Sequence, residues 1–175
     1  MNERMGRNIE IKARIADLQR VLTKAADIAD EGPFELHQDD TFFRCEIGRL
    51  KLRVLSESSG ELIFYQRSDQ PGPKESSYSI YATSSPQMLR DVLASAYGQV
   101  GSVRKHRTLF LAGRTRVHLD RVEGLGDFLE LEVVLREGET VEAGVREAHS
   151  LMEQLGVRPD QFVARAYIDL LIASD

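Results

Sequence analysis

Charged side chains recur at every second position in five short segments of this chain. The segments cover residues 8–14, 49–53, 105–107, 114–120 and 128–133. Lysine and arginine suit phosphate oxygens, whereas closely spaced carboxylates such as Glu130 and Glu132 suit a hard divalent metal. The pattern therefore indicates a site for a polyphosphate and a metal ion. A plain solvated face is the alternative, because runs of charge are usually solvated.

The same segments are typical of β-strands. Successive side chains of a strand point to opposite faces, so each segment has one ionic face and one mostly apolar face. The outward face of an ordinary solvated sheet mixes uncharged polar residues with both signs of charge. Here basic residues crowd three or four strands, and carboxylates come from two others, at Glu10 and at Glu130 with Glu132.

The composition is that of one globular domain, which we expect to span residues 1–175. Hydrophobic residues make up 42% and charged residues 29% of the chain, a normal balance for a protein with a real core. The net charge of -5 argues against a surface that binds nucleic acid as a whole, because such domains tend to be basic. Any basic site must be local.

Cysteine usage and the absence of apolar runs set further limits. Cys45 is the single cysteine, which excludes an internal disulfide, and we expect it to be a small buried hydrophobe. The first six residues lack the apolar stretch of a signal peptide, and no run is long enough to be a membrane helix. We therefore expect a cytoplasmic protein with no membrane partner.

Hydrophobic periodicity divides the chain into strands and helices. Strands are expected at 8–14, 35–45, 49–55, 61–67, 78–83, 102–112, 114–122 and 128–136. Helices are expected from residue 17 to before Gly32-Pro33, from Ser85 to near Gly98, at 139–155 and at 160–172. The stretch 68–77 is expected to be a loop, with Lys74 in solvent. A position of Lys74 over an opening of the barrel is the alternative.

A sheet with one charged and one apolar face can bury the apolar face and keep the charged face hydrated if it curls into a barrel. The expected fold is α+β: an antiparallel β-barrel of about eight strands whose charged face lines the lumen. Amphipathic helices then cover the apolar outside with their own apolar stripes.

At this point the sequence resembles the CYTH superfamily, the triphosphate tunnel metalloenzymes. The family's signature strand, E-x-E-x-K, is matched by NIEIK at 8–12. Further similar segments follow in the family's order: GRLKLR (48–53), LIFYQR (62–67), KHR (105–107), RVHLD (116–120), GLGDFLELE (124–132) and YIDLL (167–171). The GLGDF turn is most similar to the class IV adenylyl cyclase-like branch.

The resemblance implies an antiparallel tunnel and a role for each matching residue. Eight basic residues would point into the tunnel and hold a triphosphate, namely Lys12, Arg49, Lys51, Arg53, Arg67, Lys105, Arg107 and Arg116. The implied ligands of one or two Mg²⁺ or Mn²⁺ ions are Glu10, Glu130 and Glu132, with Asp120 as a further ligand or as a partner that orients a basic residue. The implied catalytic residues are Glu10, Lys12, Glu130 and Glu132.

One position departs from the family pattern. Asn8 stands where the signature has its first glutamate, so the site loses one carboxylate. The amide oxygen can still ligate a hard metal, but a neutral ligand holds a cation less strongly. The loss of this carboxylate weakens the expectation that a second metal ion binds.

Three functions are compatible with these residues. The resemblance favours a metal-dependent enzyme of the class IV adenylyl cyclase type, which converts ATP to cyclic AMP and pyrophosphate. A triphosphatase acting on tripolyphosphate, thiamine triphosphate or a nucleoside triphosphate is the first alternative. A non-catalytic polyphosphate- or nucleotide-binding module is the second, because Asn8 reduces the metal-binding capacity.

The expected partner is a small-molecule triphosphate, and the protein is expected to be a monomer or homodimer. Nucleic acid is not expected, because stacking aromatics should then share the basic face, and only Tyr65 does. Tyr65 and His118 have the inward parity and could contact a base or ribose; a packed strand histidine is the alternative for His118. Clustered cations repel one another, so the fold is expected to survive Lys51→Ala or Arg53→Ala.

Overall fold

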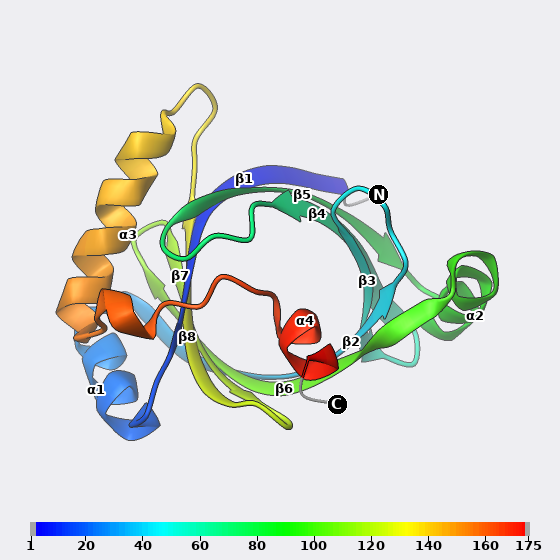
Figure 1. Cartoon of the computed structure of the whole chain (residues 1–175), viewed down its shortest axis with the longest axis horizontal. Helices are drawn as coiled ribbons and strands as arrows, with labels where there is room; N and C mark the ends of the chain where they lie inside the picture. The colour runs from blue at the N-terminus through cyan, green and yellow to red at the C-terminus, as the bar shows by residue number, and fades with distance from the viewer. Residues whose placement is uncertain (1–2, 174–175) are drawn as a thin grey trace.

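The strands of this protein close into one barrel. The computed structural model describes residues 3–173 (Figure 1). In this part of the chain the strands are β1 (Glu3–Arg14), β2 (Glu31–Phe43), β3 (Arg49–Ser56), β4 (Ser59–Arg67), β5 (Lys74–Thr83), β6 (Gln99–Ala112), β7 (Thr115–Val122) and β8 (Gly126–Val134). Their order around the barrel is β1-β5-β4-β3-β2-β6-β7-β8, and each neighbouring pair is antiparallel. The predicted α+β barrel is confirmed.

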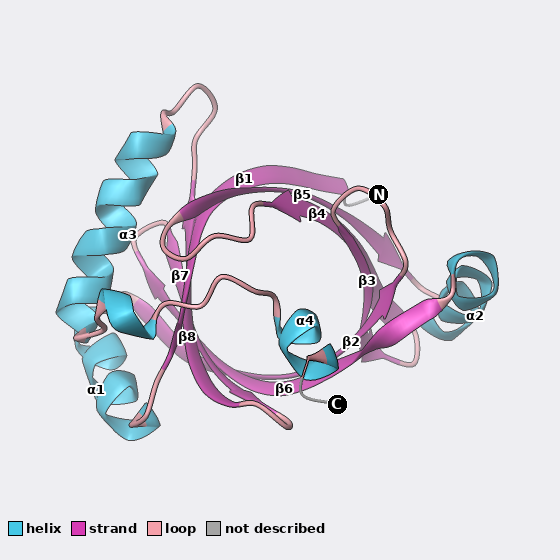
Figure 2. Cartoon of the chain, in the orientation of Figure 1, coloured by secondary structure: helices cyan, strands magenta, loops and turns pink. Residues whose placement is uncertain are grey.

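Three helices cover the apolar outside of the barrel, as predicted (Figure 2). They are α1 (Leu18–Ile28), α2 (Pro86–Tyr97) and α3 (Val141–Leu155). The helices α1 and α3 pack on the outward residues of β1, β7 and β8 in the largest apolar cluster, and α2 packs on β2 and β3 through Leu93. Burial of these apolar stripes is the main force that holds the helices on the sheet.

The first strand shows how the alternation is used. Ile9, Ile11 and Ala13 point outward and are fully buried beneath the helices, whereas Glu10 and Lys12 point inward and line the barrel interior. A one-residue shift of register would exchange the two sets and place charge in the apolar layer. The apolar residues therefore specify which charges enter the lumen.

The C-terminal segment differs from the predicted helix at 160–172. It contains a short 3-10 turn (Pro159–Gln161), an extended stretch, and the helix α4 (Tyr167–Ile172). The stretch is extended because its backbone pairs with β1: Phe162 forms a bridge with Ala13, and the Val163 amide donates to the Lys12 carbonyl at 2.9 Å.

The helix α4 lies at one mouth of the barrel and not on its outer surface. It overlies the ring of strands in the view of Figure 2, and its residues Tyr167 and Ile168 pack with Phe42 and Val103. Gly101 leaves room for this packing, since a Cβ atom there would lie 2.9 Å from Ile168 Cδ1. One end of the barrel is therefore narrowed by the end of the chain.

Two further predictions were wrong. Lys74 is buried, because β5 begins at this residue and pairs it with Glu10 of β1, and its Nζ donates to the Gln70 carbonyl at 2.8 Å. Cys45 is exposed, because it lies in the turn between β2 and β3 and not within either strand.

None of the helices in the described residues combines the length and the apolar character needed to cross a membrane.

Candidate functional site

A cavity of about 500 Å³ occupies the interior of the barrel. Most of the residues predicted from the sequence meet on its wall. The predicted basic residues on the wall are Lys12, Lys51, Arg53, Arg67, Lys105, Arg107 and Arg116, and the predicted carboxylates are Glu10, Glu130 and Glu132. The charged faces of the strands therefore converge on one cavity.

The remaining two predicted residues lie apart from the cavity wall. Arg49 is near α4, where one guanidinium nitrogen donates to Asp69 at 2.7 Å and to Asp169 at 2.6 Å. Asp120 is fully buried behind the basic residues of β6. Arg49 thus joins the C-terminal helix to the barrel, and Asp120 supports side chains that reach the cavity.

Asp40 forms a centre of ion pairs on the β2–β3 side. Lys51 Nζ donates to it at 2.8 Å, and Arg53 donates to both of its oxygens at 2.7 and 2.8 Å. Burial alone would raise the pKa of Asp40, but the charges of Lys51 and Arg53 outweigh burial and hold that pKa well below its usual range. The carboxylate is therefore ionised and fixes both cations.

Asp120 forms a second such centre on the β6–β7 side. Arg107 donates to its two oxygens at 2.6 Å each, the Tyr167 hydroxyl donates at 2.9 Å, and Lys105 Nζ lies 3.4 Å away. Burial opposes ionisation, yet Arg107 and Lys105 lower the pKa of Asp120. With Arg107 and Tyr167 on its oxygens, Asp120 orients basic residues in this structure.

Lys105 is a cation whose pKa this environment lowers strongly. Its side chain is almost fully buried, and burial together with the neighbouring Arg107 lowers its pKa to about 7. Bringing an anion into the cavity would favour the charged ammonium. Lys105 can therefore gain a proton when a polyphosphate binds.

The acidic residues gather where β1, β8 and β7 adjoin. Glu10 is paired across the strands with Glu132, and Lys12 with Glu130. Burial, followed by the charges of Glu132 and Glu130, raises the pKa of Glu10 to about 7. Carboxylates that repel one another in this way are suited to a shared divalent cation.

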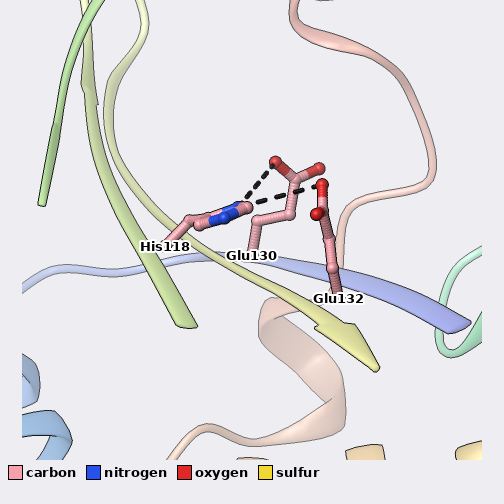
Figure 3. A group of neighbouring side chains, drawn as sticks. All are labelled: His118, Glu130 and Glu132. Atoms are coloured by element: carbon pink, nitrogen blue, oxygen red, sulfur yellow. Dashed lines mark ion pairs between the residues drawn. The ribbon is translucent and has the colours of Figure 1, made fainter. Parts of the chain in front are cut away.

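His118 completes this acidic group from β7. It is paired with Glu130 across the strands, and Figure 3 shows its ring directed toward both Glu130 and Glu132. Burial and the charge of Arg107 lower the pKa of His118, which favours the neutral imidazole. One ligand atom from each of the three residues can be chosen so that all lie within 4.8 Å of one another. This set of donors fits a divalent cation.

Asn8 has partners of its own beside this group. With its amide oriented to satisfy both ends, its oxygen accepts a hydrogen bond from Arg116 at 3.1 Å, and its nitrogen donates to the Arg7 carbonyl at 3.1 Å. Arg116 also donates to Glu132 at 2.7 Å. The residue that replaces the signature glutamate therefore helps to hold a basic side chain.

Sequence reasoning missed Asp40, Tyr167 and Tyr78 as part of the cavity wall. Asp40 follows another aspartate, so its parity could be assigned only once the ends of β2 were known. Tyr167 comes from a segment whose place over the barrel depends on tertiary pairing. Tyr78 packs over Gly6, where a Cβ atom would collide with the Tyr78 hydroxyl. The alternation of side chains along β5 could have placed Tyr78 on the inward face.

Comparisons with known proteins agree with this architecture. An adenylate cyclase of Aeromonas hydrophila is 25% identical over 167 residues, which is 91% of this chain and 85% of that protein. A protein of Pyrococcus horikoshii has a similar fold, with a TM-score of 0.82 and 21% identity over 93% of this chain and 98% of that one. A Hippeastrum protein for which a dominant triphosphatase activity is described has a TM-score of 0.66 and 13% identity, over 97% and 96% of the two chains.

The model of the CYTH domain family matches residues 6–167. The match covers the whole barrel from within β1 to the start of α4. This chain belongs to the CYTH domain family.

Proposed function

We propose that this protein is a metal-dependent enzyme that acts on a triphosphate held inside the barrel. The best-supported reaction is that of an adenylyl cyclase, in which ATP gives cyclic AMP and pyrophosphate. The observation that carries the proposal is the convergence of basic side chains from β1, β3, β4, β6 and β7 with Glu130 and Glu132 on one cavity. Such a set is what phosphoryl and nucleotidyl transfer require of a protein.

The apolar part of the cavity wall supports a substrate that carries an organic group. Leu36, Leu55, Ile80 and Leu109 line the cavity, and each lies in the half of its strand that is distant from α4. Leu36 and Leu55 are exposed. A nucleoside at this end would cover apolar surface while its phosphates reach the cations.

The chain's own residues divide the work of the reaction. Lys12 Nζ lies 3.4 Å from Glu130 and 3.9 Å from the centre of the Tyr167 ring, which fixes the ammonium in the lumen. Lys51, Arg53 and Arg107 would neutralise the phosphates of the leaving pyrophosphate, since the 3′-hydroxyl of the ribose replaces pyrophosphate on the α-phosphorus. Fixed cations of this kind need little reorganisation as charge moves to the leaving group.

Glu10, Glu130 and Glu132 would hold the metal ion. A divalent ion bound there would act as a Lewis acid toward the phosphate oxygens. Asp120, whose oxygens already accept from Arg107 and Tyr167, acts in this proposal as a positioning residue for Arg107 and Lys105.

Triphosphate hydrolysis is the second candidate. It is favoured by the Hippeastrum fold relative that is described as having a dominant triphosphatase activity. The same cations would hold the chain of phosphates while water replaces the ribose hydroxyl as nucleophile.

An assay with separate product readouts tests the proposal. Purified protein is incubated with Mg²⁺ or Mn²⁺ and with ATP, tripolyphosphate or thiamine triphosphate, and phosphate, pyrophosphate and cyclic AMP are measured individually. Cyclic AMP and pyrophosphate in equal amounts from ATP support the cyclase. Phosphate without cyclic AMP supports the hydrolase, and with tripolyphosphate as the substrate it is released together with pyrophosphate. Tight tripolyphosphate binding without turnover would contradict both and favour a binding module.

The variant that tests the metal-binding role combines Glu130→Gln with Glu132→Gln. It keeps the shape of both side chains but removes their charge, so turnover should fall by at least about 100-fold, comparable to the loss of a main electrostatic group in other active sites. Binding of tripolyphosphate without metal should be retained. Turnover equal to that of the unaltered protein would remove both residues from the site.

A further inference from the structure

One polar atom beside the acidic group has no hydrogen-bond partner. His118 is only 3% exposed, and its Nδ1 atom accepts from and donates to nothing within hydrogen-bond reach among the described residues. A buried polar nitrogen that is left unpaired destabilises the folded protein. A site that retains such an atom calls for a ligand.

The unpaired nitrogen is directed at the two carboxylates. It lies 3.9 Å from Glu130 Oε2 and 3.9 Å from Glu132 Oε1, and the side chains face one another (Figure 3). These separations are too long for hydrogen bonds. They match ligands of a shared ion, because atoms about 2.1 Å from one metal lie roughly 3–4 Å from one another.

The surroundings of the group already neutralise part of its charge. Glu130 accepts from Arg107 at 2.9 Å and lies 3.4 Å from Lys12, and Glu132 accepts from Arg116. A neutral imidazole adds a donor without adding negative charge. The chain therefore offers one nitrogen and two oxygen donor atoms at this place.

We propose that His118 ligates, through Nδ1, the ion held by Glu130 and Glu132, and that this nitrogen makes the site select a divalent first-row transition ion over Mg²⁺. The inference rests on the proposed metal-dependent function and names the ion class of that same site. Imidazole suits zinc, iron, copper and nickel, whereas Mg²⁺ prefers carboxylate, carbonyl and water oxygens, a preference that Mn²⁺ partly shares. Mn²⁺ is the probe of choice because it is paramagnetic.

The state of Asn8 fits this assignment. The amide oxygen is engaged by Arg116, so β1 supplies one carboxylate ligand, Glu10, where the family signature has two. His118 on β7 adds a donor on the other side of β8. The ligand number is maintained while its chemistry changes.

The test measures metal binding directly, in the absence of substrate. Protein labelled with ¹⁵N-histidine is loaded with Mn²⁺ and studied by pulsed electron paramagnetic resonance. We expect a ¹⁵N coupling typical of a directly coordinated imidazole. Bound Mn²⁺ without this coupling, or no Mn²⁺ binding at all, would overturn the proposal, and either result is independent of whether any triphosphate is turned over.

Variants give a second readout. His118→Asn should abolish the coupling to Mn²⁺ and lower the affinity for Zn²⁺ by at least about tenfold, with Mg²⁺ affinity changed by less than about threefold. His149→Asn, at an exposed position of α3, is the matched control and should behave as the unaltered protein. Equal losses of Zn²⁺ and Mg²⁺ affinity would contradict the selectivity. If His118→Asn does not fold, the coupling in the unaltered protein still decides the matter.

Discussion

At the residue scale, the cations of the barrel are held by buried carboxylates, and this changes what their removal should do. Lys51 and Arg53 share Asp40, which is only 2% exposed. The expectation that the basic residues mainly repel one another was made without these partners. Two cations share one carboxylate, so the group keeps an excess positive charge, but deletion of either cation removes a charged hydrogen bond that compensates the burial of Asp40.

We therefore expect Lys51→Ala to weaken triphosphate binding and also to destabilise the protein. Asp40 keeps both bonds to Arg53 but loses a charged hydrogen bond, which is worth about 1–3 kcal/mol. Thermal unfolding should move down by roughly 2–4 °C per kcal/mol for a chain of this size. Calorimetry with tripolyphosphate measures the binding, and Lys51→Arg serves as the control that keeps the charge. An increase in melting temperature would show that repulsion dominates after all.

Lys105 should link anion binding to proton uptake. Its folded-state pKa of about 7 lies below the ordinary value of 10.5, so at pH 8 the unliganded side chain is mostly neutral. A bound polyphosphate favours the ammonium, and binding at pH 8 should take up close to one proton more than in Lys105→Arg. Titration calorimetry in buffers of different ionisation enthalpy measures this difference. Equal uptake by both proteins would contradict it.

The same shift determines how Lys105 affects stability. Between about pH 7 and 10.5 the unfolded chain binds the proton and the folded protein does not, so this residue's contribution to stability rises with pH across that window. Its cost to the fold is present in full below pH 7.

At the element scale, the alternation of β1 and β8 made the barrel and most of its site predictable. Ile9 and Ile11 could face the helices only if Glu10 and Lys12 faced the lumen, and this holds in the structure. Alternate side chains of a strand face opposite sides whatever the neighbouring strands are. The alternation could therefore predict which residues line the lumen, but not the ion pairs that they form.

The conformation of the C-terminal segment and the position of Arg49 could not be predicted from the alternation, because both depend on tertiary contacts. The periodicity of 160–172 suits a helix, but backbone pairing of Phe162 with β1 overrides it. Arg49 has the parity of its strand, yet Asp169 of α4 draws it to the mouth. Contacts between segments more than a hundred residues apart decided both outcomes.

The contact of α3 with β1 gives a prediction for Gly144. A Cβ atom there would lie 2.5 Å from Ile9 Cγ1 and 2.8 Å from Leu135 Cδ2. Helix propensity alone would make Gly144→Ala stabilising by about 1 kcal/mol, but overpacking should reverse the sign and cost about 1–3 kcal/mol. Urea unfolding measures the change.

Ser150→Ala is the control for Gly144→Ala, because it raises propensity at an exposed position of the same helix. It should be neutral or slightly stabilising. Stabilisation by Gly144→Ala as well would mean that α3 can move away from the barrel at little cost.

At the scale of the whole molecule, a ligand in the lumen contacts most of the strands and should stabilise the barrel as one unit. At a tripolyphosphate concentration of 100 times Kd, the linkage gain is about 2.7 kcal/mol. The melting temperature should then rise by roughly 5–10 °C. Differential scanning calorimetry with increasing ligand measures the shift.

The control for this shift is Arg158→Ala, which removes an exposed pair with Asp160 outside the cavity. It should respond to tripolyphosphate as the unaltered protein does, whereas Lys51→Ala should respond less. A similar shift in all three proteins would indicate binding elsewhere on the surface.

The pairing of β1 with β8 also has a consequence for how the protein is made. One edge of β1 pairs with β5, but the other stays unpaired until β8 leaves the ribosome, because Glu10 pairs with Glu132, more than a hundred residues later in the chain. Until then no lumen exists, and the acidic and basic rows that will face each other are hydrated separately. Truncation before residue 126 should leave both β1 and β7 with unpaired edges, which are templates for aggregation. The helix α4 can pack at the mouth of the barrel only after the ring of strands has closed.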